Sequence, residues 1–141
     1  MSREQIYAAV FSLASNAANF VTKSRNLVSI DAVNSADLPA LFQEQVLERI
    51  EQGARGVPPR KILEIKLHVY VGNFDAGVSV STQLNGLLDA LELALAADSA
   101  TGVQTLGGLV SHCWVEGKLE IFEGNAGEKA RAVVPVRVLV A

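Results

Sequence analysis

KILEIKLHVYV, residues 61–71, alternates between apolar and polar side chains more regularly than any other stretch of the chain. One set of alternate residues is aliphatic: Leu63, Ile65, Leu67, Val69 and Val71. The other set is polar or amphipathic: Glu64, Lys66, His68 and Tyr70. A period of two is that of a β-strand, whose successive side chains point to opposite faces of a sheet. We therefore predict a strand here, with the aliphatic set facing the core.

The segment before this strand, ALFQEQVLERIEQ at residues 40–52, has the composition of a helix but the setting of a strand. Leu, Gln, Glu and Arg are good helix formers. Its alternation is weak, with Phe42, Glu44, Val46 and Glu48 on one side. However, a Gly- and Pro-rich connection at residues 53–60 leads directly into the strand at residues 61–71. Because consecutive strands usually pair, we predict an antiparallel strand at residues 40–52 and a hairpin loop at residues 53–60.

A helix is predicted on each side of this hairpin in the sequence. Ser2 and Gln5 have the spacing of a capping box, so the first helix covers about residues 3–19. The second begins after Ser79 or Ser81 and ends near residue 98, with leucines recurring at helical spacing. Between the first helix and the hairpin, residues 20–37 are polar, and residues 27–30 form a short strand or an extended loop.

The stretch QTLGGLVSHCWVEG, residues 104–117, leads into a third predicted strand that covers about residues 106–123. Alternation directs these residues to the core: Leu109, Ser111, Cys113 and Val115. It directs these to the opposite face: Val110, His112, Trp114 and Glu116. Gly117 indicates a bulge in this strand. A fourth strand at residues 130–140 follows a turn, and Pro135, which has no backbone N–H, indicates an edge strand or a bulge there.

The predicted order is α-β-β-α-β-β. One face of each strand is apolar and the other is mixed, so both helices should cover the apolar face. We therefore predict a single α+β domain over residues 1–141, an antiparallel four-stranded sheet with two helices on one face.

The composition excludes several classes of protein. The chain has 141 residues, of which 50% are hydrophobic and 19% are charged, so we do not expect disorder over most of its length. A net charge of -3 with dispersed basic residues gives no reason to expect tight binding to DNA or RNA. A single Cys fits a reducing compartment. With neither a signal peptide nor a membrane span in the pattern, we expect a soluble protein made in the cytoplasm.

No catalytic or metal-binding constellation emerges from the residues. His112 and Cys113 are neighbours in a strand, so their side chains point to opposite faces and make a poor nucleophilic pair. Neither His112 nor His68 has the further ligands that a metal site needs. The carboxylates on the strands, among them Glu64 and Glu116, are typical of a solvated face. We therefore predict no cofactor and no metal.

The mixed face of the predicted sheet carries several large apolar side chains among its charges. They are Tyr70, Val110, Trp114, Phe122, Val133 and Leu139. An exposed, partly apolar sheet face is typical of a protein–protein surface. The alternative is that a loop or the N-terminal region covers it. We favour self-assembly through this face.

Taken together, these motifs resemble the tail terminator (tail completion) proteins of long-tailed double-stranded DNA bacteriophages. The resemblance rests on LPALF at residues 38–42 with the polar strand after it, on HVYV at the end of the strand at residues 61–71, and on LNGLLDALELAL at residues 84–95. QTLGGLV at residues 104–110, followed by a V-x-H strand, is its most specific part, and residues 132–140 complete it. With the N-terminal helix, it covers nearly the whole chain.

The resemblance implies a structural virion protein at the head-proximal end of the tail, present in the host cytoplasm during assembly. Members of this family form a hexameric ring on the tail tube, end its polymerisation and offer a surface to the head–tail connector or neck protein. DNA passes through the ring without specific binding. No enzymatic reaction, cofactor or membrane is implied. The alternatives are a head–tail connector or neck component or, in another class, a small-molecule enzyme that uses His112 and nearby carboxylates.

A cyclic ring needs two different complementary patches on each subunit. For one patch we predict the mixed sheet face, with Tyr70, His112, Trp114 and Arg137. For contacts along the tube axis we predict two hairpin tips. They are residues 53–60, with Arg55 and Arg60, and residues 124–128, with Glu128.

Overall fold

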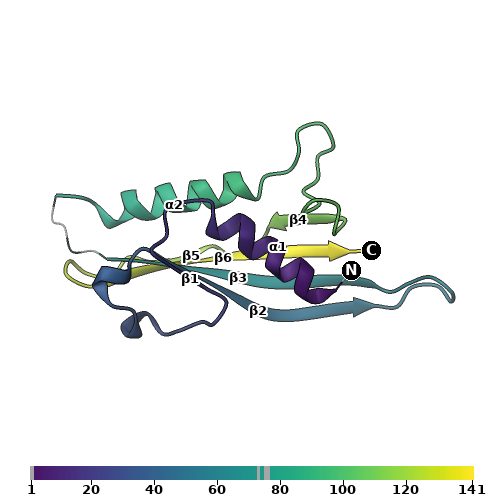
Figure 1. Cartoon of the computed structure of the whole chain (residues 1–141), viewed down its shortest axis with the longest axis horizontal. Helices are drawn as coiled ribbons and strands as arrows, with labels where there is room; N and C mark the ends of the chain where they lie inside the picture. Colours follow the sequence, from purple (N-terminus) through teal and green to yellow (C-terminus); the bar gives the residue numbers. More distant parts are fainter. Residues whose placement is uncertain (1, 73, 75–76) are drawn as a thin grey trace.

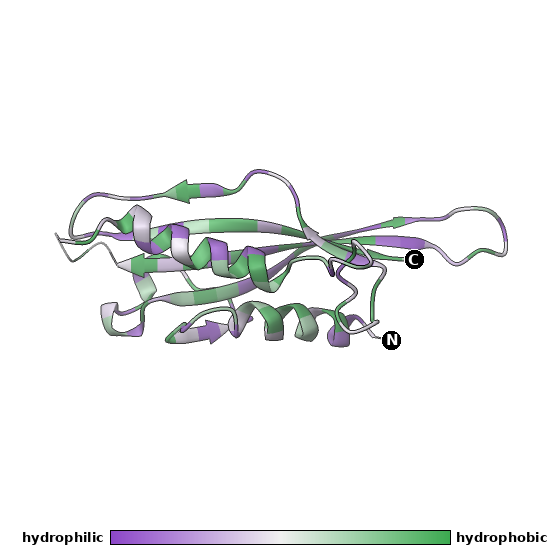
Figure 2. Ribbon diagram, turned by 90° about the horizontal axis from the view of Figure 1, so that it is seen from above, coloured by the Kyte–Doolittle hydropathy of each residue, from purple (hydrophilic) through white to green (hydrophobic). Residues whose placement is uncertain are grey.

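The long hairpin that alternation predicts is the centre of the fold. The structure is a computed structural model, and it describes residues 2–72, 74 and 77–141. Strand β2 (Ala40–Glu51) pairs antiparallel with β3 (Arg60–Gly72) from Ala40↔Tyr70 to Glu51↔Arg60. The end of this hairpin extends beyond the helices as an arm (Figures 1 and 2). The strand assignment for the helix-like segment is therefore confirmed.

The sheet has six strands, not the four that the sequence predicts. Strand β6 (Lys129–Val140) pairs antiparallel with β3 from Lys61↔Val140 to Gly72↔Lys129. Two short strands, β4 (His112–Val115) and β5 (Glu120–Phe122), pair one after the other with the far edge of β6. Strand β1 (Thr22–Ser24) adds to β2 in parallel. The single α+β domain is confirmed, but its sheet is mixed, in the order β1-β2-β3-β6-β4 with β5 also on β6.

The third predicted strand is interrupted at Gly117, and Pro135 explains why. The Glu116 N–H donates to the Pro135 carbonyl, so the side of Pro135 that lacks an N–H faces the gap between β4 and β5. Gly117 fills this gap with φ 124°, and a Cβ on it would lie 3.3 Å from the Pro135 ring. Pro135 thus lies in a central strand, not at an edge or bulge of β6 as predicted, and it ends the pairing of its neighbour.

Both helices cover one face of the sheet, as predicted. Helix α1 (Arg3–Ser15) begins with the predicted capping box, in which the Ser2 hydroxyl accepts from the Gln5 N–H at 3.2 Å. Helix α2 (Val80–Ala94) has Ser79 as its N-cap residue and ends about four residues earlier than predicted. The main core consists of the apolar stripes of both helices and the inward residues of β3 and β6. All five aliphatic residues of the 61–71 alternation are in it.

A β-bulge in β2 changes which side chains face the helices. The register with β3 shifts between Gln45 and Leu47, so Val46 is an extra residue. Leu47 then pairs with Glu64, and Glu48 pairs with Leu63, which is a core residue. Glu48 therefore points to α1, where its carboxylate accepts from Arg3 Nε at 2.8 Å and from Tyr7 Oη at 3.2 Å. The weak alternation predicted for this segment, with Glu48 on the side of Phe42, is wrong beyond the bulge.

Candidate assembly surface

The helix-free face of the sheet has a covered half and an open half. In the covered half, the segment 27–38, which contains two 3-10 turns, lies over β2 and β3. A second small core results, made of Ile30, Val33, Leu38, Ala40, Phe42 and Tyr70. Residues 27–30 are thus loop and 3-10 turn rather than a strand.

Tyr70 belongs to this covered half and is not available to a partner. It is 2% exposed, its ring lies 5.2 Å from that of Phe42, and its hydroxyl donates to the Val28 carbonyl at 2.8 Å. Burial raises the pKa of its phenol. Lys129 fastens the same segment, because its ammonium donates to the carbonyls of Ile30 and Val33. The prediction of Tyr70 as an interface residue is therefore wrong, and here the alternative, a covering loop, holds.

The open half consists of two rows of side chains that cross the sheet. Cross-strand pairing gives one row as Leu47, Glu64, Arg137 and Trp114. It gives the next row as Arg49, Ile62, Leu139 and His112. Three of the predicted interface residues, His112, Trp114 and Arg137, thus lie together on one face. Each row combines apolar and charged groups, a composition that suits a contact with another protein.

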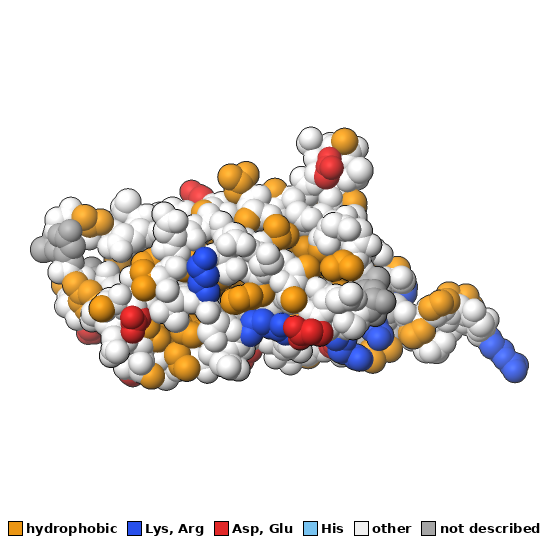
Figure 3. Space-filling view, in the orientation of Figure 1, with side chains coloured by type: hydrophobic (Ala, Val, Ile, Leu, Met, Phe, Trp, Pro, Cys, Tyr) orange, Lys and Arg blue, Asp and Glu red, His pale blue; other side chains and the backbone are white. Residues whose placement is uncertain are grey.

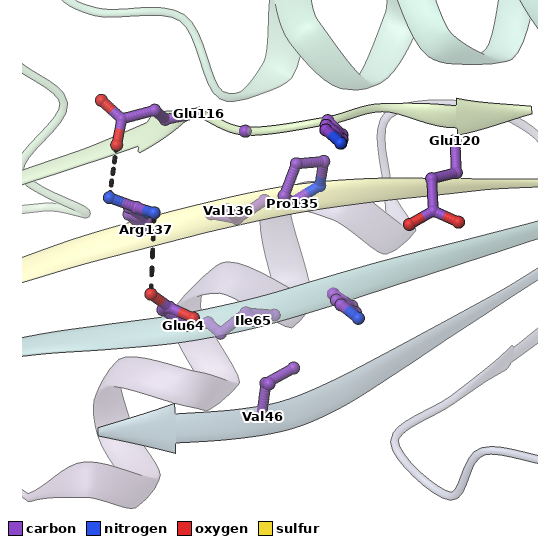
Figure 4. Close-up of a pocket in the computed structure, with 11 residues that line it drawn as sticks. Val46, Glu64, Ile65, Glu116, Glu120, Pro135, Val136 and Arg137 are labelled. Atoms are coloured by element: carbon purple, nitrogen blue, oxygen red, sulfur yellow. Dashed lines mark ion pairs between the residues drawn. The ribbon is translucent and has the colours of Figure 1, made fainter. Parts of the chain in front are cut away.

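Side-chain contacts hold this open half in a defined arrangement. The Arg137 guanidinium lies between two carboxylates, 3.7 Å from Glu64 and in an ion pair with Glu116 (Figure 4). The His112 ring stacks on Trp114 with centroids 5.0 Å apart and planes 13° apart. The backbone N–H of Gln104 donates to His112 Nδ1 at 3.1 Å, so the neutral ring carries its proton on Nε2. A planar, pre-ordered surface of this kind loses little side-chain entropy when a partner binds.

Cys113 lies on the other side of the same strand. It is 1% exposed in the main core, and burial raises the pKa of its thiol to about 12. A thiol with this pKa stays protonated at neutral pH and is a poor nucleophile. Since His112 contacts Trp114 on the opposite face, the structure keeps the two residues apart, as the alternation predicts.

A shallow hollow of about 190 Å³ lies on the helix-free face beside Arg137 (Figure 4). Glu64, Glu116 and Glu120 line it together with Lys66 and Lys118, so its lining carries charges of both signs. Pockets for small molecules usually measure roughly 300–1,000 Å³ and are mostly apolar, so this hollow is smaller and more charged than such a pocket.

In the part of the chain that the structure describes, no three His, Cys, Asp or Glu side chains group closely enough to hold a metal ion. No helix among the described residues is long and apolar enough to cross a membrane.

The two predicted hairpin tips lie at opposite ends of the molecule. The β2–β3 loop, with Arg55 and Arg60 exposed, forms the end of the arm, where Figure 3 shows a basic side chain beyond a row of hydrophobic ones. The β5–β6 turn is at the other end, and there Glu128 is exposed and accepts from the Asn125 side chain at 3.1 Å. The structure brings neither tip near His112 and Trp114.

Sequence reasoning missed the exposed apolar side chains on the arm. Leu47, Ile50 and Val57 are between 45% and 55% exposed, yet they lie on or between two regular strands. Apolar residues on a strand that extends beyond the helices were the available signal, since no helix can cover them.

Comparison of the chain with models of known protein families and with the sequences of characterised proteins gave no match.

Proposed function

We propose that this chain is a structural virion protein that forms a hexameric ring on the end of a phage tail tube. The ring ends polymerisation of the tube and offers the surface to which the head–tail connector binds. The observation that carries the proposal is the open half of the helix-free face, where Trp114, His112 and Arg137 form an ordered and uncovered surface. The resemblance of the sequence to tail terminator proteins supplies the identity of the assembly.

Size-exclusion chromatography with light scattering over a range of protein concentrations tests this proposal. We expect oligomers, with the hexamer as the closed state, and addition of tail tubes should promote ring formation at their ends. A chain that stays monomeric at every concentration and also in the presence of tail tubes would contradict the proposal.

Substitution of His112 separates this function from that of an enzyme. His112→Ala removes the ring stacked on Trp114 but leaves the buried core intact. We expect it to change assembly or have no effect. If instead a small-molecule turnover were found and lost in this variant, the chain would belong to a different class.

A further inference from the structure

The sheet has an open edge on each side. Within the described residues, β1 covers the outer edge of β2 only at Ala40–Phe42, and no strand pairs with that edge from Gln43 to Glu51. On the other side of the sheet, β6 is the one strand of the described chain with which β5 pairs. The outer edge of the neighbouring β4 is not free in this way, because the Cys113 N–H donates to the Gln104 carbonyl at 2.8 Å. Unpaired strand edges are templates on which another chain can add a strand.

The direction of the strands allows these two edges to pair between copies. Strand β2 is antiparallel to β3, β3 to β6, and β6 to β5, so β2 and β5 run in opposite directions. In a ring whose successive copies extend one another's sheet, β2 of one copy meets β5 of the next as an antiparallel pair. The helix-free faces of both copies then lie on the same side, as a continuous sheet requires.

The side chains on the two edges are assigned to faces by their partners. On the helix-free face of β2 lie Leu47, Arg49 and Glu51, and Ile50 lies on the helix side. On the helix-free face of β5 lie Glu120 and Phe122, opposite Val133 and Arg131. Just before β5, Lys118 lines the hollow of the helix-free face and Leu119 packs against the main core. Apart from the half-buried Leu119, all of these edge side chains are exposed.

We propose that β2 of one copy adds to β5 of the next, with Leu47 opposite Phe122 and Arg49 opposite Glu120. This inference rests on the proposed ring and names its subunit contact. The same register places Glu51 opposite Lys118 on the helix-free face and Ile50 opposite Leu119 on the helix side. It thus joins two apolar pairs and two pairs of opposite charge, each of which stabilises an antiparallel contact.

The neighbouring registers are less favourable. A shift by one residue would bring the helix-free face of one strand against the helix side of the other. A shift by two residues in one direction places Arg49 opposite Lys118. A shift by two in the other direction places Glu51 opposite Glu120. Like charges directly opposite each other destabilise a strand pair, so of these three registers with matching faces the proposed one alone avoids repulsion.

The geometry of the contact also fits a closed ring. Leu47 lies level with Arg137 across the sheet, whereas Phe122 lies level with Arg131, six residues away along β6. At a rise of about 3.4 Å per residue this offset is roughly 20 Å, and four strands per copy are roughly 19 Å wide. In a ring built with this offset, every strand would be tilted by about 45° from the ring axis. This value is close to the tilt of roughly 35–45° typical of closed barrels.

Disulfide cross-linking between single-cysteine additions tests the register. Leu47→Cys and Phe122→Cys proteins are prepared separately, mixed and oxidised mildly. We expect a disulfide-linked dimer only in the mixture, because the contact joins two different edges. The doubly substituted chain should give a ladder that ends at the number of copies in the ring. As the matched control, Leu47→Cys with Glu120→Cys should cross-link little, since the register then differs by two residues. The native Cys113 is buried and does not interfere.

Charge reversal provides a second test that does not depend on a cross-link. Arg49→Glu and Glu120→Arg should each raise the protein concentration needed for assembly by roughly threefold to tenfold. The double variant should restore it. Glu92→Arg, on the exposed side of α2, is the control of equal charge change and should have no effect. Circular dichroism of the monomers should show unchanged folding, because both residues are exposed.

The possible failures separate this inference from the proposed function. If the native chain assembles, but the mixture gives no cross-link and neither charge reversal weakens assembly, the strand contact is wrong and the ring stands. If the native chain never assembles, both the proposed ring and the proposed strand contact are wrong.

Discussion

The two halves of the helix-free face are built on the same strands but are used differently. In one half, the segment 27–38 covers Tyr70, and Lys129 fastens that segment from β6. In the other half, β3 and β6 present Ile62, Leu139 and Arg137 to the surroundings, with Trp114 from β4 beside them. The alternation of β3 and β6 is continuous through both halves. A strand pattern therefore determines which side chains share a face, whereas a distant segment determines whether that face is core or surface.

The largest difference between the halves should appear on truncation of their aromatic residues. Tyr70→Ala removes a buried ring and its hydrogen bond to Val28, and should lower the free energy of unfolding by about 3–5 kcal/mol. Trp114→Ala, the matched change in the open half, should cost about 1 kcal/mol, because Trp114 is only half-buried. Urea denaturation of the monomer measures both. Equal losses would mean that the halves do not differ as described.

A smaller effect is expected at the lysine that holds the covering segment. Lys129→Met keeps the length of the side chain but removes the donor to the Ile30 and Val33 carbonyls, which should cost about 1.5–3 kcal/mol. Lys118→Met in the open half should stay within about 0.5 kcal/mol, since Lys118 is exposed. Limited proteolysis should cut residues 27–38 faster in the Lys129 variant alone. Unchanged cleavage there would show that other contacts hold the segment.

The smallest effect is expected at the ion pairs of the open half. Arg137 and its partners Glu64 and Glu116 are all partly exposed, so Arg137→Ala should cost no more than about 1 kcal/mol. Salt screens exposed pairs, so the difference from the native chain should shrink in high salt. Denaturation at low and high ionic strength checks this. A loss that is large and independent of salt would point to a packing role for the Arg137 stem.

The sequence predicted the parts of this fold that depend on local pattern. Regular alternation identified β3 and β6, and the capping box at Ser2 identified the start of α1. The three-residue strand β1 was missed because so short a segment carries no period, and its pairing with β2 joins residues far apart in the chain. The split between β4 and β5 likewise depends on Gly117 lying beside Pro135, which becomes visible only once the strands are paired.

The candidate surface was predicted in part, for the same reason. His112, Trp114 and Arg137 were placed together because their positions in two adjacent strands have the same orientation. Tyr70 has that orientation too, but the segment that buries it lies about forty residues earlier in the chain. No pattern in residues 61–71 indicates that this segment covers Tyr70.

The bulge at Val46 determines which side chains of the arm lie on each face of the sheet. Without the bulge, Val46 would itself pair with β3, the alternation that starts at Phe42 would continue, and Glu48 and Ile50 would share the face of Phe42. With it, odd-numbered residues take over that face, and Glu48 turns to Arg3 and Tyr7. By leaving Val46 out of the ladder, the bulge directs Glu48 to α1 and also places Leu47, Arg49 and Glu51 on the helix-free face. Deleting Val46 would remove the bulge and leave Leu47 opposite Glu64, so the arm would keep its two faces.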